Sequence, residues 1–159
     1  MKTFLIDPQK CTGCHLCEMT CALKHHDVFS LEIGNIKIES DEDRGFHVPT
    51  KCMQCEVAYC MKSCVASALY RDEVTGAMLV DRSKCIGCKA CIMACPFGSI
   101  TWVTIAKGSE IHICNLCDGD PECVKVCRDH AISYIDQDKI NRDKRQETRY
   151  RLTEESSNS

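Results

Sequence analysis

Residues 85–96 read Cys85-Ile86-Gly87-Cys88-Lys89-Ala90-Cys91-Ile92-Met93-Ala94-Cys95-Pro96, and the organisation of the whole chain follows from their spacing. The first three cysteines recur at every third residue, and a short loop through them can wrap three corners of a cube. Gly87 permits the positive φ angle that such a tight wrap needs. Cys95 lies about one helical turn beyond Cys91 and therefore points away from that cube. One such run predicts a partner run elsewhere in the chain.

The 16 cysteines of this chain fall into four sets of four, with none left over. The first set repeats the tight spacing of residues 85–95, whereas the second and fourth sets have a longer middle gap. The sets are Cys11, Cys14, Cys17 and Cys21; Cys52, Cys55, Cys60 and Cys64; Cys85, Cys88, Cys91 and Cys95; and Cys114, Cys117, Cys123 and Cys127. This alternation indicates an internal duplication, with one half over Cys11–Cys64 and the other over Cys85–Cys127.

The composition limits the compartment and the partners. With 20 Lys and Arg against 23 Asp and Glu, the chain has no excess of positive charge for binding nucleic acid. The N-terminal residues contain neither an apolar signal region nor a twin arginine, and no apolar stretch is long enough to span a bilayer. We therefore expect a cytoplasmic protein without a membrane partner, in a compartment where thiols stay reduced and bind metal.

Four chemistries compete for the cysteines. Disulfides need an oxidising compartment, which the sequence does not indicate. Structural zinc usually takes two C-x2-C pairs separated by a longer spacer, whereas each tight set packs four thiols into 11 residues. Residues 11–15 fit the C-x-x-C-H motif of c-type haem, but Cys17 and Cys21 continue the tight spacing. The tight sets match the bacterial ferredoxin run C-x2-C-x2-C-x3-C, which holds [4Fe–4S] clusters, and this interpretation is favoured.

The segment Lys10–Tyr134 resembles the four-cluster ferredoxin-type subunits that accompany molybdenum or tungsten pterin oxidoreductases, in the family of the dimethyl-sulfoxide reductase and formate dehydrogenase iron–sulfur subunits. The resemblance implies four [4Fe–4S] clusters with crossed ligation, in which the last cysteine of each set serves another cluster. The implied ligands are Cys11, Cys14, Cys17 and Cys127 for cluster 1; Cys21, Cys114, Cys117 and Cys123 for cluster 2; Cys52, Cys55, Cys60 and Cys95 for cluster 3; and Cys64, Cys85, Cys88 and Cys91 for cluster 4.

The fold implied by this resemblance is α+β, with tandem bacterial two-[4Fe–4S] ferredoxin-like folds of short strands, hairpins and short helices. Residues 1–48 plus 106–135 would form one unit with two clusters, residues 49–105 an inserted unit with the other two, and residues 136–159 a polar C-terminal tail. From the residues themselves we expect strands near 2–7, 35–39 and 132–135, and hairpins with turns at Asp72–Gly76 and Lys107-Gly108. The tail is rich in Lys and Arg; we expect it to be solvated or disordered, or else a basic arm that docks on a partner subunit.

The function implied is that of an electron-transfer subunit without a catalytic site of its own. The six histidines are scattered and are interpreted as surface or loop residues. Three of the sets are preceded directly by a lysine, namely Lys10, Lys51 and Lys84. These lysines are interpreted as solvated loop residues or as charges that tune a nearby cluster. No Gly-rich dinucleotide fingerprint is present, so flavin chemistry would belong to another subunit.

The expected partner is a large molybdenum- or tungsten-pterin oxidoreductase subunit, together with a flavin subunit. The small size and the lack of an anchor favour the complex of a tungsten aldehyde oxidoreductase, and copies that stack end to end would extend the electron path. The alternatives are a free, diffusible polyferredoxin, the electron-transfer subunit of a hydrogenase or formate dehydrogenase, and an iron–sulfur sensor.

Overall fold

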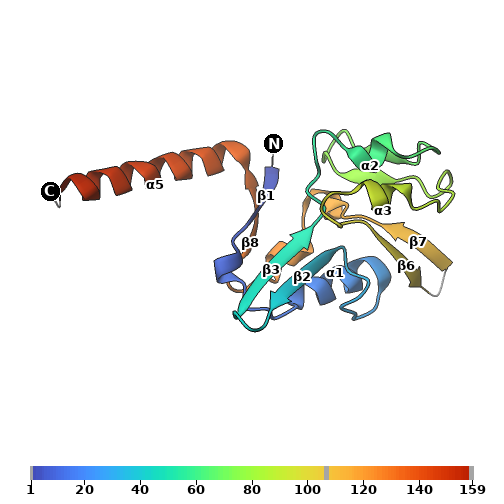
Figure 1. The fold of residues 1–159 in the computed structure, drawn as a ribbon, viewed down its shortest axis with the longest axis horizontal. Helices are drawn as coiled ribbons and strands as arrows, with labels where there is room; N and C mark the ends of the chain where they lie inside the picture. The colour runs from blue at the N-terminus through green and yellow to red at the C-terminus, as the bar shows by residue number, and fades with distance from the viewer. Residues whose placement is uncertain (1, 106–107, 158–159) are drawn as a thin grey trace.

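The computed structural model describes residues 2–105 and 108–157, which form a small body of short strands and helices with one long helix extending from it (Figure 1). In chain order the elements are β1 (Lys2–Ile6), η1 (Pro8–Lys10), α1 (Leu16–His26), β2 (Ile36–Asp41), β3 (Phe46–Lys51), α2 (Tyr59–Lys62), β4 (Leu69–Arg71), β5 (Met78–Val80), α3 (Ala90–Ala94), β6 (Thr101–Ile105), β7 (Gly108–His112), η2 (Leu116–Gly119), α4 (Glu122–Lys125), β8 (Ile132–Asp136) and α5 (Gln137–Ser157). None of the helices in these two ranges is long and apolar enough to cross a membrane.

The strands pair into small antiparallel sheets of two strands each, namely β1 with β8, β2 with β3, β4 with β5, and β6 with β7. Three of these pairs are local hairpins, and the expected hairpins around Asp72–Gly76 and before β7 are confirmed, although Lys107 itself lies outside the described residues. The pair β1–β8 is different because it joins the two ends of the body, with Ile6 opposite Ile132. The strands expected near residues 2–7 and 132–135 are therefore confirmed, and they pair with each other.

The strand β3 was not predicted, because Pro49 interrupts its sequence pattern. Pro49 lies opposite Ile38 in the ladder with β2 and is buried. A proline removes one backbone donor, which is tolerated here because both strands of a two-stranded sheet are edge strands. The strand therefore forms although the proline makes it hard to recognise from the sequence.

Two separate clusters of buried side chains take the place of a single large core. One combines Cys17, Cys21, Ile36, Cys123 and Ile132. The other combines Cys52, Ala58, Leu69, Met78, Cys91, Ile100, Ile111 and Ile113. Ile111 and Ile113 lie beyond the expected unit boundary at residue 106, yet they pack in the second cluster. Cysteines make up a large share of both clusters, so whatever binds them also contributes to the core.

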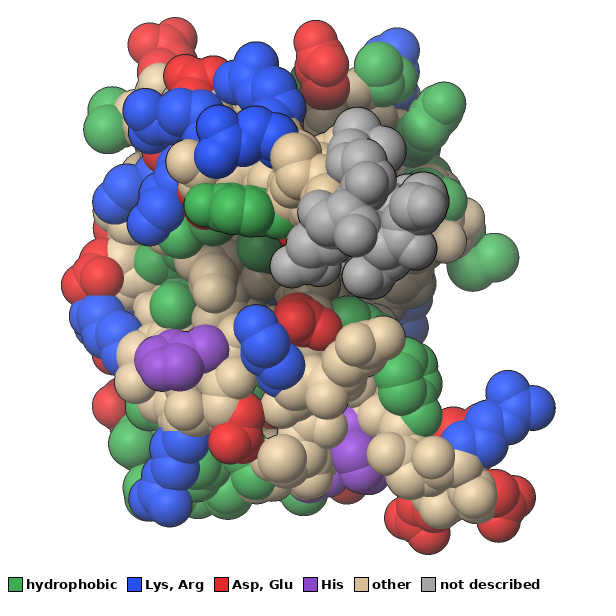
Figure 2. Space-filling model, turned by 90° about the vertical axis from the view of Figure 1, so that its left-hand side faces the viewer, with side chains coloured by type: hydrophobic (Ala, Val, Ile, Leu, Met, Phe, Trp, Pro, Cys, Tyr) green, Lys and Arg blue, Asp and Glu red, His purple; other side chains and the backbone are tan. Residues whose placement is uncertain are grey.

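The segment expected as a solvated or disordered tail forms the helix α5, which extends from the body (Figure 1). Its described side chains from residue 137 to 150 are exposed except for the half-buried Ile140. Lys, Arg, Gln and Glu dominate its sequence, and all four have high helix propensity. Propensity therefore accounts for a helix that has no apolar face against the body. In the view from the α5 side, Lys and Arg side chains gather on the upper part of the surface (Figure 2).

Candidate metal centre

All four cysteine sets begin with the same backbone turn. The residue just before the second cysteine has a positive φ angle in every set: 67° at Gly13, 52° at Gln54, 69° at Gly87 and 60° at Leu116. The expectation for Gly87 is thereby confirmed. Because only glycine adopts this region without strain, Gln54 and Leu116 hold a conformation that their own side chains disfavour. Four equivalent loops, two of them strained, indicate that the turn serves the position of the flanking thiols.

Three cavities in the described part of the chain are each lined by four cysteines, three from one set and one from another. The first is lined by Cys11, Cys14, Cys17 and Cys127; the second by Cys52, Cys55, Cys60 and Cys95; the third by Cys64, Cys85, Cys88 and Cys91. Their volumes are alike, at about 20 Å³ each. Since each cavity receives its fourth cysteine from a different set, a group bound in it would link two loops.

The remaining four cysteines also lie near one another. Burial, and after it repulsion from Cys114, Cys21 and Cys117, raises the pKa of Cys123. Burial likewise raises the pKa of Cys21 to about 11, and Cys114 and Cys117 contribute to the rise. These four thiols are close enough to oppose each other's ionisation, which a bound cationic core would offset.

The chemistry of the donors fits an iron–sulfur cluster. Burial raises the pKa of Cys17 to about 12 and of Cys52 to about 11, so these thiols would not ionise at neutral pH without a cation beside them. Backbone N–H groups also point at the sulfurs: Asn35 N donates to Cys21 Sγ and Ala68 N to Cys64 Sγ, each at 3.2 Å. N–H···S hydrogen bonds of this kind stabilise thiolate ligands of a cluster.

Cys64 shows the effect of such hydrogen bonds on a single thiol. Burial raises its pKa, but the N–H groups of Ala68, Leu69, Ala66 and Ser67 outweigh that effect, so the pKa is lowered overall. The loop after Cys64 therefore favours the thiolate form, which is the form that binds metal.

The spacing of the thiols argues against mononuclear zinc sites. Every cysteine lies in the described part of the chain. Within that part, the group whose three ligand atoms lie within 4.8 Å of one another consists of two histidines and a glutamate, without a cysteine. Zinc–sulfur bonds of about 2.3 Å would bring four thiolates within about 3.8 Å of one another. The sulfur atoms of the cysteine groups are spread more widely than this, which fits a metal cluster better than a single ion.

The three lysines that precede cysteine sets have different environments. Lys10 and Lys84 are exposed, and each pairs at 3.2 Å with an aspartate three residues earlier, as expected for solvated loop residues. Lys51 differs, because it is only 4% exposed. Its Nζ donates to Cys52 O at 2.7 Å and lies 3.6 Å from the centre of the Phe4 ring.

The buried Lys51 also lies among thiols of two predicted ligand sets. Burial lowers its pKa, while the nearby Cys114, Cys52 and Cys123 act to raise it. Cys52 belongs to the predicted set for cluster 3, and Cys114 and Cys123 to that for cluster 2. The expectation of a solvated residue is wrong for Lys51, since chain folding places it between two sites that are distant in sequence.

The histidines also depart from the expected pattern in part. His15 caps the start of α1 with a positive φ angle and pairs with the buried Glu18, whose other oxygen accepts a hydrogen bond from Ile38 N at 2.9 Å. His25 Nε2 lies 3.5 Å from Cys117 Sγ. His112 is only 3% exposed and lies on β7, so its interpretation as a surface or loop residue is wrong. Its burial depends on packing between segments that are distant in sequence, so no local motif predicts it.

Comparison with known families agrees with the cysteine chemistry. Residues 44–137 match the 4Fe-4S dicluster domain, and residues 8–24 match a 4Fe-4S binding domain. The "Aliphatic sulfonate oxidoreductase, polyferredoxin-like subunit" of Pyrococcus furiosus is 43% identical over 125 residues, which cover 79% of this chain and 70% of that protein. The "Putative electron transport protein YsaA" of Escherichia coli is 34% identical, over 89% of this chain and 95% of that protein. The "Electron transport protein HydN" of Escherichia coli is 32% identical, over 88% and 91%.

Proposed function

Because this chain belongs to the 4Fe-4S dicluster domain family, we propose that it is the subunit through which single electrons pass along four [4Fe–4S] clusters. It is a ferredoxin-type iron–sulfur electron-transport protein related to polyferredoxin-like and HydN-type proteins. A cluster bound at each site would take up and release one electron at a time. The single observation that carries the proposal is the crossed grouping of cysteines in three cavities.

The ligand sets that we propose are those implied by the resemblance. Cys127, Cys95 and Cys64 each complete a cavity built by another set, which supports clusters 1, 3 and 4. The mutual repulsion of Cys21, Cys114, Cys117 and Cys123 supports cluster 2. Each unit of the proposed tandem ferredoxin-like fold would thus hold two clusters, with residues 49–105 inserted in the unit made by residues 1–48 and 106–135.

Iron and acid-labile sulfide assays on anaerobically purified protein test the number of clusters. Four cubanes give about sixteen iron atoms and about sixteen sulfides per chain. About eight of each would reduce the proposal to two clusters, and zinc in place of iron would overturn it. An electron paramagnetic resonance spectrum of the reduced protein should show magnetically interacting [4Fe–4S] centres.

The partner that we propose is the catalytic molybdenum- or tungsten-pterin subunit of an oxidoreductase, with a flavin subunit as a further member of the complex. A relative at 43% identity is called a subunit of an aliphatic sulfonate oxidoreductase, which supports a dedicated oxidoreductase partner. A tungsten aldehyde oxidoreductase would be one such complex. Purification of the tagged chain from its native cells, followed by mass spectrometry and metal analysis, should recover one large metal-containing subunit.

A free, diffusible polyferredoxin is the second candidate, and the names of two relatives favour it. YsaA and HydN are described as electron transport proteins without mention of a catalytic partner. Such a protein would purify alone and exchange electrons with several enzymes, including a hydrogenase or a formate dehydrogenase. Recovery without any large subunit, at low salt, would favour this candidate over the dedicated subunit.

Self-association would extend the path for electrons beyond one molecule. If clusters lie near both ends of the body, copies stacked end to end would form a longer wire. Mass photometry over a range of concentrations tests this proposal, because stacking predicts a series of growing masses. A single fixed mass at every concentration would contradict it.

A further inference from the structure

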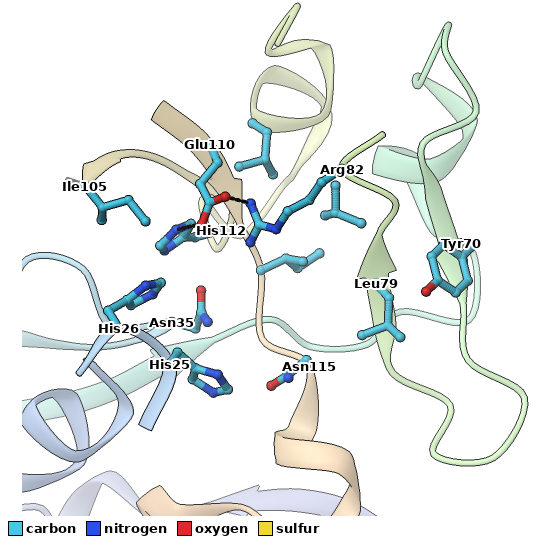
Figure 3. Close-up of a pocket in the computed structure, with 13 residues that line it drawn as sticks. His25, His26, Asn35, Tyr70, Leu79, Arg82, Ile105, Glu110, His112 and Asn115 are labelled. Atoms are coloured by element: carbon cyan, nitrogen blue, oxygen red, sulfur yellow. Dashed lines mark hydrogen bonds and ion pairs between the residues drawn. The ribbon is translucent and has the colours of Figure 1, made fainter. Parts of the chain in front are cut away.

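A polar cavity of about 420 Å³ has no cysteine in its lining, although its residue His25 lies 3.5 Å from Cys117 Sγ (Figure 3). It lies where the end of α1, the strand β7 and the hairpin β4–β5 meet. Its polar lining includes His25, His26, Arg82, Glu110 and His112. Such a concentration of imidazole and charge within one cavity has no role in holding an iron–sulfur cluster through thiolates, and it therefore needs a separate explanation.

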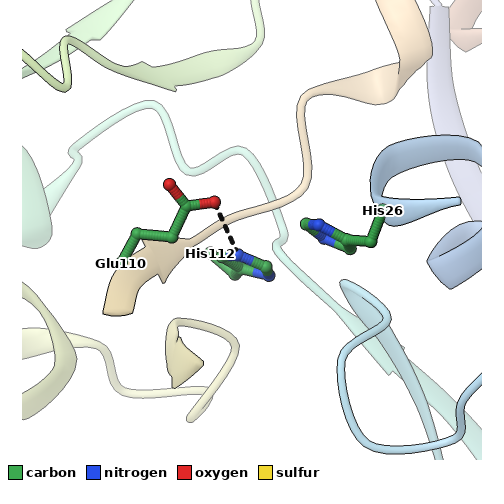
Figure 4. A group of neighbouring side chains, drawn as sticks. All are labelled: His26, Glu110 and His112. Atoms are coloured by element: carbon green, nitrogen blue, oxygen red, sulfur yellow. Dashed lines mark hydrogen bonds and ion pairs between the residues drawn. The ribbon is translucent and has the colours of Figure 1, made fainter. Parts of the chain in front are cut away.

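Three of these side chains bring their ligand atoms close together (Figure 4). His26, Glu110 and His112 each offer a ligand atom, and the three atoms lie within 4.8 Å of one another. The rings of His26 and His112 are stacked nearly parallel, at 8° with their centres 4.3 Å apart, so one ring must turn about its Cβ–Cγ bond before both can bind one ion. The group is assembled from α1 and β7, which are far apart in sequence.

The hydrogen bonds of His112 show what its ring nitrogens face. Nδ1 lies 3.4 Å from the carbonyl oxygen of Ile33, which can only accept, so Nδ1 carries the proton. Nε2 lies 3.1 Å from Glu110 Oε1. An imidazole nitrogen and a carboxylate oxygen that can bind one ion are therefore already adjacent.

His26 and Arg82 supply two further observations. His26 Nε2 is buried and has no hydrogen-bond partner. Arg82 pairs with Glu110 Oε2, which leaves Oε1 to face the histidines (Figure 3).

We propose that His26, Glu110 and His112 bind one divalent first-row transition-metal ion, separate from the iron–sulfur clusters. Two imidazoles and one carboxylate form a ligand set suited to Zn²⁺ or Fe²⁺. The contacts of Ile33 O with His112 and of Arg82 with Glu110 are those that orient metal ligands from behind. Three protein ligands leave at least one coordination position open toward the cavity, where water or a small anion can bind.

Zinc titration of the cluster-loaded protein tests the proposal. Isothermal titration calorimetry should give one Zn²⁺ site per chain, and X-ray absorption at the zinc edge should show N/O ligands at about 2.0–2.1 Å without sulfur at about 2.3 Å. That spectrum excludes zinc that has entered a damaged cluster site. Zinc bound through sulfur, or no zinc binding by the native protein, would overturn the proposal.

Conservative variants assign the ligands. His26→Gln and Glu110→Gln should each weaken zinc binding at least tenfold, while His130→Gln and Glu32→Gln, at exposed positions, should leave it unchanged. Iron and sulfide content serves as the folding control for each protein. If His26→Gln and Glu110→Gln retain full iron content and the zinc affinity of the native chain, the site does not exist.

Discussion

Cys95 is the residue at which crossed ligation can be tested most directly. It caps the C-terminal end of α3, and its thiol lines the cavity of Cys52, Cys55 and Cys60 rather than that of its own set. Cys95→Ser should therefore damage cluster 3 and spare cluster 4. We expect a loss of up to about four iron atoms per chain, with Cys85→Ser as the matched variant that damages cluster 4 instead. Electron paramagnetic resonance spectra of the reduced variants check this prediction. Identical spectral changes in both variants would refute crossed ligation.

Lys51 carries a charge whose position can be tested by its effect on potentials. A buried ammonium group near Cys52, Cys114 and Cys123 would stabilise the reduced, more negative form of clusters bound by these cysteines. Lys51→Met keeps the volume and removes the charge, so we expect lower reduction potentials for the clusters of those cysteines. Lys84→Met, at the equivalent but exposed position before Cys85, should have little effect because water and salt screen its charge.

A redox titration monitored by electron paramagnetic resonance would separate these outcomes. Equal shifts in Lys51→Met and Lys84→Met would mean that burial of the lysine has no special influence on the clusters. An upward shift in Lys51→Met would contradict the electrostatic argument itself.

At the scale of single elements, the turn that opens the first cysteine set leaves no room for a Cβ atom at Gly13. A Cβ atom on Gly13 would lie 2.8 Å from the His47 ring, and the φ angle there is +67°. Gly45 has a similar φ of +61° but open space around it. Gly45→Ala should therefore cost about 1–2 kcal/mol for its backbone alone, and Gly13→Ala should cost more.

Denaturation in urea, followed by bleaching of the cluster absorbance under anaerobic conditions, compares the two variants. The Gly13→Ala protein should also lose iron from the site of Cys11, Cys14 and Cys17, which the loop supports. Equal denaturation midpoints for both variants would show that the approach of His47 to the loop has no energetic consequence.

The elements also show which parts of the structure a sequence can reveal. Cysteine spacing, turn glycines and short apolar runs are local, so the cluster loops, the hairpins and the strands at both ends were predictable from the chain alone. The burial of Lys51, and the meeting of His26 with Glu110 and His112, depend on contacts between distant segments. No local spacing encodes them. The helix α5 was missed for another reason: its polar sequence fits a solvated helix as well as a disordered tail.

At the scale of the whole molecule, α5 is separable from the body. Its basic residues Lys139, Arg142, Lys144, Arg145 and Arg149 are exposed, and the helix extends away from the cysteine sites (Figure 1). A chain that ends at Asp136 should keep its full iron content and its denaturation midpoint. It should lose retention of a partner subunit if the helix is the docking arm.

A second variant keeps the helix α5 but removes part of its charge, which separates the effect of the charge on partner binding from the effect of the helix itself. Replacing Lys139, Arg142 and Arg145 by Gln should weaken partner retention and reduce its dependence on salt concentration. Loss of iron from the shortened chain would show that α5 stabilises the body. Unchanged partner retention in both variants would assign docking to another surface.

The pairing of β1 with β8 has a consequence for how the protein matures. The cavity of Cys11, Cys14 and Cys17 receives Cys127, which lies just before β8, whereas the cysteines of the two central cavities all lie between Cys52 and Cys95. During synthesis, all cysteines of the central sites are therefore made before residues 96–159. The site that begins with the first cysteine receives its last cysteine only when Cys127 is made, so the chain supplies complete cysteine groups from the middle of the sequence outward.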